Sequence, residues 1–179
     1  MNYLVKYSPE ITIKSRPVRT RFAKQLRTNL AKLLLRLSEE IQIKGNWGYV
    51  GVEVPATLNH LQPQVEQVLA STQGICFYER VQVFKVNTLD EILLHTLPIF
   101  QNRLIGKTFA VRCRRIGKHD FTSMDVEKFV GSGLNTNIKT AGVSLSNPEA
   151  LVKLEIRKDK LFVVEENFPG LSGFPLGTL

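Results

Sequence analysis

The sequence predicts an α+β fold made of two consecutive domains, residues 1–84 and 85–179. Short segments in which apolar and polar residues alternate are typical of strands, and longer segments with apolar residues every three or four positions are typical of helices. Both kinds of segment follow one another along the whole chain. Its 179 residues suffice for one large domain or two small ones, at roughly 100–200 residues per domain.

The first half is predicted to have a β-α-β-β-α-β order. A strand over Asn2–Tyr7 precedes a long helix over Arg16–Leu37, for which Ser15 is the expected N-cap. The remaining elements are strands over Ile41–Gly45 and Val50–Val54 joined by a hairpin turn at Gly45–Gly48, a helix over Leu58–Leu69, and a strand over Ile75–Val86. This order is that of a ferredoxin-like domain, in which helices cover an antiparallel sheet.

The second half is predicted to continue with two helices, a strand between them and a closing β-hairpin. The elements are a helix from Asn87 or Thr88 to Leu104, a strand over Lys107–Arg115, a helix from Thr122 to Thr140, and hairpin strands over Leu151–Ile156 and Leu161–Val164. Asp125, three residues after Thr122, predicts a capping box. The tail over residues 170–179 lacks periodicity and is interpreted as an ordered connector.

The charge balance is basic, because 24 Lys and Arg residues face 16 Asp and Glu residues for a net charge of +8. A basic surface favours polyanions such as nucleic acid or an anionic membrane. No run approaches the roughly 20 apolar residues that a membrane span needs. Cys76 and Cys113 stand alone, without metal-ligand spacing or the pattern of a disulfide framework. We therefore expect a cytoplasmic protein with no membrane partner and no metal site.

A first acid-poor basic surface is predicted on the helix over Arg16–Leu37. Residues 1–36 contain nine Lys and Arg residues and the single acid Glu10. A merely solvated helix face usually mixes both signs of charge, because acid–base pairs four residues apart stabilise it. Phosphate binding is therefore the better account of this face. The candidate RNA-binding residues are Lys14, Arg16, Arg19, Lys24 and Arg27.

A second basic cluster lies on the strand over Lys107–Arg115 and the loop after it. Arg112 and Arg114 share one strand face and can present their guanidinium groups to phosphate. The candidates on this surface are Arg112, Arg114, Arg115, Lys118, His119 and Phe121. His119 and Phe121 have the rings needed to stack on an unpaired base. The alternatives are that Phe121 is a hydrophobic staple before Thr122 and that His119 forms ordinary surface hydrogen bonds.

Gly131 and Gly133 fall inside the helix that Thr122 begins, where each glycine costs roughly 0.5–1 kcal/mol relative to alanine. Close approach of another backbone is the usual reason for such a cost. That backbone belongs either to the protein itself or to a bound RNA. On the second interpretation Gly131, Gly133 and Asn135 are further RNA-binding candidates.

No catalytic residue is predicted. The chain contains no GxxxxGK[ST], GxSxG or HExxH motif. Cys113 with His119 would suggest a nucleophile and base, but Cys113 alternates onto the apolar face of its strand, which favours a buried structural cysteine. We therefore expect no enzymatic activity and no cofactor in this chain alone.

Three motifs resemble one known family. They are KYSPEITIKS at Lys6–Ser15, the stretch RCRRIGKHDFTSMDVEKFVGSGLN at Arg112–Asn135, and FPLGT at Phe174–Thr178. In this order they are similar to the N-terminal half of the bacterial tRNA 4-thiouridine synthetases, sulfurtransferases also used in thiamine thiazole synthesis. The resemblance implies a ferredoxin-like domain followed by a THUMP domain, which together bind tRNA. It further implies that the THUMP domain grips the 3′ acceptor end. The matching RNA-contacting positions are Arg112, Arg114, Arg115, Lys118 and His119, and Gly131, Gly133 and Asn135 also match.

In this family the FPxGT segment leads into a PP-loop domain that uses ATP to adenylate uridine, with a catalytic cysteine beyond it. Residues 1–179 contain no SGGxDS-type ATP loop, and neither Cys76 nor Cys113 corresponds to that cysteine. The resemblance thus implies tRNA and a PP-loop catalytic domain, in cis or in trans, as partners. It expects ATP only with that domain, and it allows a homodimer. The alternatives are an RNA-binding adaptor with a separate catalytic partner, a module that binds polyanions or acidic proteins generally, and ATP-dependent thiolation by the chain itself.

Overall fold

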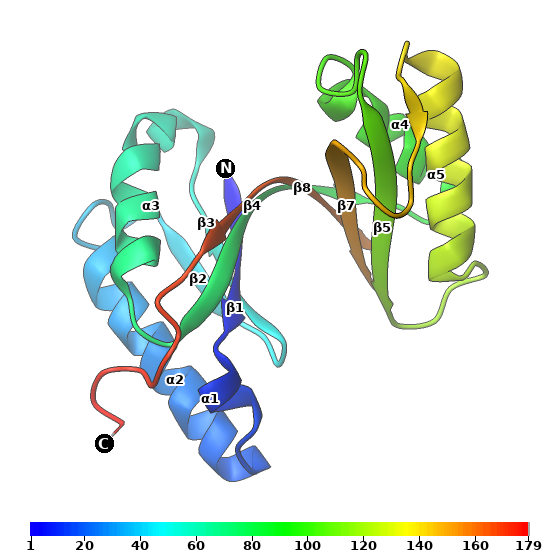
Figure 1. Ribbon diagram of the computed structural model, residues 1–179. Helices are drawn as coiled ribbons and strands as arrows, with labels where there is room; N and C mark the ends of the chain where they lie inside the picture. Colours follow the sequence, from blue (N-terminus) through cyan, green and yellow to red (C-terminus); the bar gives the residue numbers. More distant parts are fainter. Residues whose placement is uncertain (179) are drawn as a thin grey trace. The chain divides into compact units, whose positions relative to one another are not determined.

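The computed structural model describes residues 1–178 and divides them into two compact units (Figure 1). The first unit comprises residues 1–81 and 166–178, and the second comprises residues 82–165. The predicted division placed the segment 166–178 in the second domain, whereas the structure places it in the first unit. No helix among the described residues is long and apolar enough to cross a membrane.

The first unit contains the β-α-β-β-α-β order with short helical insertions. Its elements are β1 (Asn2–Tyr7), α1 (Pro9–Thr12), α2 (Arg16–Leu34), β2 (Gln42–Gly45), β3 (Tyr49–Glu53), the 3₁₀ helix η1 (Ala56–Leu61), α3 (Gln62–Ser71) and β4 (Ile75–Lys85). The strand order is β2-β3-β1-β4, followed by the end of β8 (Lys160–Pro169). β1 pairs antiparallel with both β3 and β4, and β2 pairs antiparallel with β3.

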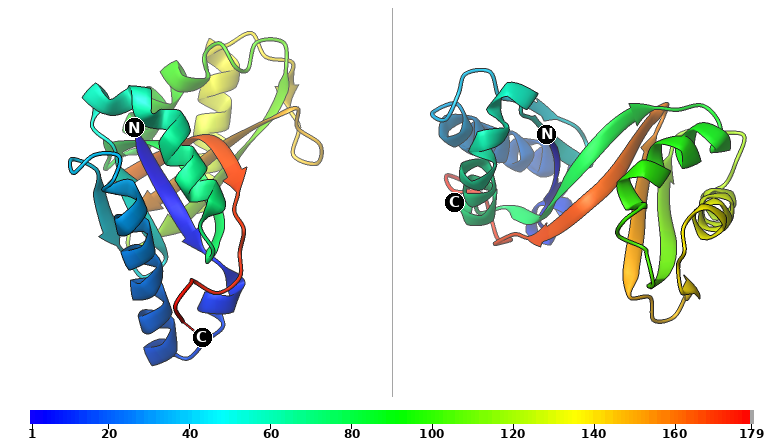
Figure 2. Two further views of the ribbon diagram at one scale, coloured as in Figure 1. Left: turned by 90° about the vertical axis from the view of Figure 1, so that its left-hand side faces the viewer. Right: turned by 90° about the horizontal axis from the view of Figure 1, so that it is seen from above.

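Helices α2 and α3 lie on one face of this sheet (Figures 1 and 2). Phe22, Leu26, Leu30 and Leu34 recur along α2 and are buried against the sheet. This apolar stripe fixes the rotation of the helix about its axis, so the polar side of α2 remains in solvent. Several basic residues of α2 lie on that side, as the sequence predicts.

The second unit combines parallel and antiparallel strand pairs. Its further elements are α4 (Leu89–Phe100), β5 (Thr108–Ile116), α5 (Ser123–Asn137), β6 (Gly142–Val143) and β7 (Ala150–Arg157). The strand order is β4-β8-β7-β5-β6, in which β5 pairs parallel with β7 and β6 while β7 pairs antiparallel with β8. Helices α4 and α5 cover one face, where Phe109 of β5 is buried in the same core as Val130 of α5.

Local signals explain where several elements begin. Thr88 accepts a hydrogen bond from the Glu91 amide at the start of α4, and Thr122 and Asp125 form the predicted capping box of α5. Ser15 precedes α2 as predicted, but its side chain caps no amide. The elements α1 and β6 were not predicted, and the helix predicted over Leu58–Leu69 is divided between η1 and α3.

The tail after β8 has no regular structure and is bound to the first unit. The Ser8 hydroxyl donates to the Gly173 carbonyl at 2.7 Å, and the Ser172 amide donates to the Ile75 carbonyl at 2.7 Å. The Phe174 ring meets Phe22 edge-on, with 5.8 Å between ring centroids. These contacts explain why the tail belongs to the first unit. Leu179, the last residue of the predicted connector, lies outside the described residues.

Candidate nucleic-acid interface

The three arginines of β5 have different partners. The Arg112 Nη2 donates to the Leu145 carbonyl at 2.6 Å, and the Arg115 Nη1 donates to the Gly117 carbonyl at 2.9 Å. Both side chains are half-buried, whereas Arg114 between them is exposed. In the β5–β7 register Arg114 lies opposite Glu155, whose carboxylate pairs with Arg157 at 3.3 Å. Arg114 therefore offers its guanidinium to solvent, while Arg112 and Arg115 hold loops in place.

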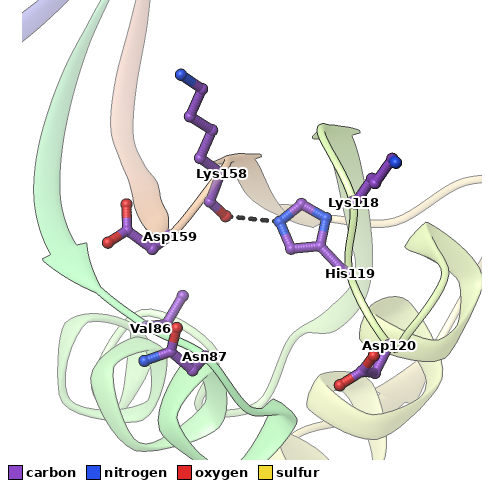
Figure 3. A pocket seen from close by; sticks show the side chains of 7 residues that line it. All are labelled: Val86, Asn87, Lys118, His119, Asp120, Lys158 and Asp159. Atoms are coloured by element: carbon purple, nitrogen blue, oxygen red, sulfur yellow. Dashed lines mark hydrogen bonds between the residues drawn. The ribbon is translucent and has the colours of Figure 1, made fainter.

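His119 is fixed by hydrogen bonds at both ring nitrogens. Its Nδ1 lies 2.8 Å from the Arg115 Nη1, and its Nε2 lies 2.6 Å from the Lys158 carbonyl oxygen (Figure 3). A guanidinium only donates and a carbonyl only accepts. Nδ1 must therefore accept and Nε2 must carry the proton. The geometry selects the neutral Nε2–H tautomer and leaves neither nitrogen free for acid–base chemistry.

Phe121 is a core residue with 8% of its surface exposed. Its ring is stacked with that of His119, with 5.2 Å between centroids, and it belongs to the same core as Val126 of α5. In a hydrophobic staple, the residue before the N-cap packs against the residue five positions later, which for Phe121 is Val126. The structure thus favours the staple interpretation of Phe121. The aromatic surface that this region presents to a base is that of His119.

A polar pocket of about 640 Å³ opens where β5 and β7 end (Figure 3). It is lined by Val86, Asn87, Lys118, His119, Asp120, Lys158 and Asp159. These residues come from the segment before α4, the β5–α5 loop and the β7–β8 turn. The carboxyl ends of parallel strands are where α/β sheets commonly bind ligands.

The walls of the pocket are held by backbone contacts. Gly117 has a φ of +111°, a left-handed conformation that favours glycine, and a Cβ there would lie 3.4 Å from the Lys158 amide nitrogen. The Lys158 amide donates to the Ile116 carbonyl at 3.1 Å. The β5–α5 loop and the β7–β8 turn are thereby packed together, and the Lys118 and Lys158 side chains extend from them in exposed positions.

The α5 glycines face the interior of the second unit. A Cβ on Gly131 would contact Val111 of β5, and a Cβ on Gly133 would overlap the Leu93 side chain of α4. The close neighbour of each glycine is therefore the protein itself. Asn135 is exposed, and its side-chain carbonyl accepts from the Thr140 hydroxyl at 2.6 Å.

In the first unit, basic residues at and just before the start of α2 approach aromatic rings. Arg19 and Arg16 lie 4.0 Å and 5.6 Å from the centroid of the Trp47 ring, and Lys14 lies 5.4 Å from that of Phe174. Arg27 lines a smaller pocket beside Trp47, and Lys24 is exposed on the same helix. From the sequence, Trp47 is predicted only to lie in a hairpin turn. A lone tryptophan between glycines at such a turn was the available signal for a functional role.

The geometry around Cys113 opposes a nucleophilic role. Burial raises the pKa of its thiol to about 12, and the Glu127 carboxylate adds to this effect. Glu127 also accepts a hydrogen bond from the Cys113 amide at 3.0 Å. The thiol therefore stays protonated at neutral pH, and His119 has no free nitrogen with which to activate it.

Residues 86–164 match the THUMP domain family. This range contains the pocket, β5 and α5, so the second unit is a THUMP domain.

The full chain is similar to tRNA sulfurtransferases. Over 179 residues it is 44% identical to the tRNA sulfurtransferase of Pseudomonas aeruginosa strain UCBPP-PA14, and over 178 residues it is 40% identical to that of Shewanella sp. strain MR-7. The chain spans 37% of the length of each relative and corresponds to their N-terminal portion. The resemblance that the three motifs predicted is therefore confirmed.

Two solved structures share the fold. A crystal structure of a Pyrococcus horikoshii Ot3 protein superposes with a TM-score of 0.81 and 25% identity, covering 99% of this chain and 58% of that one. A 4-thiouridine synthetase in complex with RNA and ATP superposes with a TM-score of 0.78 and 21% identity, covering 99% of this chain and 44% of that one.

Proposed function

We propose that this chain is a tRNA-binding module that presents tRNA for 4-thiouridine formation by a PP-loop sulfurtransferase domain, in cis or in trans. The observation that carries the proposal is the exposed pair Arg114 and Lys118, beside the His119 pocket, on a THUMP domain. The 44% identity of the whole chain to a tRNA sulfurtransferase supports tRNA as the ligand. On this proposal ATP and the chemistry of sulfur transfer belong to the PP-loop domain, and the complex acts in the cytoplasm.

The pocket favours an unpaired RNA end over a smooth duplex. Its volume of about 640 Å³ lies within the range of ligand pockets, about 300–1,000 Å³. His119 supplies a ring for stacking, Asn87 supplies an amide for the edge of a base, and Lys118 supplies a charge for phosphate. Unpaired nucleotides have the exposed faces and edges that such groups read. We therefore assign the pocket to the 3′ acceptor end of tRNA.

The test is tRNA binding by the double variant Arg114→Gln/Lys118→Gln, measured by fluorescence anisotropy over a series of salt concentrations. Each lost phosphate contact reduces the slope of log K against log salt by roughly 0.7–0.9, so the variant's slope should fall by about 1.4–1.8. Arg112 and Arg115 are left unchanged because they hold loops. Lys139→Gln, at an exposed lysine after α5, is the matched control and should leave the slope unchanged.

Three outcomes decide the proposal. An unchanged affinity in the double variant would sink the assignment of this surface. Equal affinity for tRNA and for double-stranded DNA of equal charge would favour a general polyanion-binding module. Equal affinity for tRNA with and without its 3′-terminal nucleotides would remove the acceptor end from the pocket.

A further inference from the structure

We infer that the β2–β3 hairpin tip and the start of α2 form a second RNA contact, at which the Trp47 ring stacks on an unpaired nucleotide. The residues concerned are Trp47, Arg16, Arg19 and Arg27, all in the first unit. The inference rests on the proposed function in one respect only, namely that the ligand of the chain is RNA. It adds a site that lies outside the THUMP domain.

Trp47 is exposed although it is large and apolar. About half of its surface, 53%, is in contact with solvent. The Arg19 guanidinium lies 4.0 Å from the ring centroid, and its Nη2 donates to the Trp47 carbonyl at 2.9 Å. Arginine over an indole face is a favourable cation–π arrangement. Arg19 therefore supports the ring while a large part of the ring remains open.

The hairpin that carries Trp47 is ordered before any ligand arrives. The Asn46 side chain accepts from the Trp47 amide at 2.8 Å, and the Tyr7 hydroxyl donates to the Asn46 carbonyl at 2.8 Å. The Asn46 amide donates to the Tyr49 carbonyl at 2.9 Å. A ring held in this way loses little conformational entropy when a base stacks on it, which favours binding. Within the described residues the indole N–H has no acceptor, so it is available to a ligand.

A pocket of about 240 Å³ lies beside the ring, between α2 and the hairpin. Its lining includes Arg19 and Arg27 and contains no acidic residue. Gly45 leaves the space that the Arg27 guanidinium occupies, because a Cβ at Gly45 would coincide with it. The volume is below the roughly 300–1,000 Å³ of pockets that enclose whole ligands, so the pocket fits a single group such as a phosphate.

The charges around the ring are uncompensated. Among residues 1–178, Arg16, Arg19 and Arg27 form no ion pair with a carboxylate. The first turn of α2 contains no acid, and Ser15 does not cap it with its side chain. Exposed aromatic rings interleaved with unpaired cations are the usual means of holding single-stranded nucleic acid. This excess of positive charge favours RNA over a protein partner.

Trp47 is the chain's single tryptophan, so its fluorescence reports on this site alone. We expect a short single-stranded RNA to quench this fluorescence on titration and the matching blunt duplex to quench it less. In parallel, Trp47→Ala should bind the single-stranded RNA roughly 5- to 150-fold more weakly, since stacking on one base is worth about 1–3 kcal/mol. Trp47→Phe should retain most of the affinity because phenylalanine also stacks.

A substitution that removes a charge outside the hairpin tests the site without altering the fold of the hairpin. Arg16→Gln should weaken binding and reduce the salt slope by about 0.7, the value for one contact to a single strand. Arg36→Gln, at an exposed arginine just after α2, should change neither quantity. Quenching of Trp47 by an acidic peptide as strong as that by RNA would replace the inference with a protein-binding surface.

Failure of this inference differs from failure of the proposed function. If wild-type protein binds tRNA by anisotropy while Trp47 fluorescence and the affinity of Trp47→Ala are unchanged, the stacking site is refuted and the tRNA-binding function stands. If wild-type protein binds no tRNA at all, the proposed function fails and the inference fails with it.

Discussion

Gly131 and Gly133 lie within the continuous helix α5 and face other elements of the second unit. The helix presents Gly133 to α4, where the Leu93 Cγ would lie 3.1 Å from an added Cβ and its two methyl groups would lie closer still. Gly131 faces β5 with more room, since the nearest atom to an added Cβ, the Val111 Cγ2, would lie at 3.8 Å. The two glycines therefore serve packing within the protein to different degrees.

We predict that Gly133→Ala destabilises the protein and that Gly131→Ala does not. Alanine gains about 0.5–1 kcal/mol of helix propensity at either position. At Gly133 this gain is outweighed by overpacking against Leu93, which typically costs about 1–3 kcal/mol. The free energy of unfolding, from urea denaturation followed by circular dichroism, should fall by up to about 2 kcal/mol for Gly133→Ala. It should rise slightly for Gly131→Ala.

A second substitution shows whether Leu93 is the cause. Leu93→Ala removes the overlapping atoms, so in that background Gly133→Ala should no longer destabilise the protein. A loss of tRNA affinity in Gly131→Ala with unchanged stability would instead support the RNA-backbone interpretation of this face.

The sequence was sufficient to predict which elements carry the basic residues of the candidate site, but not which of those residues bind other parts of the protein. Alternation along β5 placed Arg112 and Arg114 on one face, and this holds. That Arg112 is tied to Leu145, and Arg115 to Gly117 and His119, depends on loops that meet only in the folded chain. A binding role for Trp47 was not predicted for the same reason, since its partner Arg19 is 28 residues away in sequence.

Helix α5 begins with reciprocal hydrogen bonds between Thr122 and Asp125. The Thr122 amide donates to the Asp125 carboxylate at 2.8 Å, and the Asp125 amide donates to the Thr122 hydroxyl at 3.1 Å. The bond from the Thr122 amide is the largest cause that holds the pKa of the Asp125 carboxyl below its ordinary value of 3.8. The folded state therefore favours the ionised carboxylate.

The lowered pKa predicts a pH dependence of stability that Asp125→Asn should remove. A group with a depressed pKa in the folded state contributes its stability above the unfolded value and loses it as pH falls through the folded value. Wild-type protein should thus lose this contribution as the pH drops below 3.8, the unfolded value. The difference is measured by thermal unfolding of the wild-type and Asp125→Asn proteins at a series of pH values from neutral to below 3.8. Asp90→Asn in α4 serves as a control. Parallel curves for wild type and Asp125→Asn would contradict the prediction.

Long amphipathic elements were predictable because burial of one face imposes a regular spacing of apolar residues. Short elements were not predictable, because they contain too few residues to show such a spacing. The stripe of Phe22, Leu26 and Leu30 specifies α2 within a few residues. By contrast α1 has four residues and β6 has two, so neither shows a period. The attachment of residues 166–178 to the first unit depends on contacts such as Ser8 to Gly173, which join distant positions that no local pattern records.

The basic residues of the candidate sites form two surfaces, one in each unit. One is the start of α2 with Arg16 and Arg27, and the other is the β5–α5 region with Arg114 and Lys118. Each surface offers positive charge to phosphate. A single tRNA that contacts both would release counterions at both, whereas two RNA molecules would each report on one surface only.

We predict that losses at the two surfaces add. Arg114→Gln/Lys118→Gln and Arg16→Gln/Arg27→Gln should each lower the salt slope for tRNA by about 1.4–1.8, and the combined variant should lower it by about twice as much. Their free-energy losses should also sum, because sites without shared partners are usually additive. Titration of labelled tRNA should show one tRNA per chain. Two outcomes would mean that the surfaces act on separate molecules. One is a second bound tRNA per chain, and the other is a combined variant that binds tRNA as tightly as the more impaired of the two double variants. The reason is that only contacts to the same ligand contribute to the same binding constant.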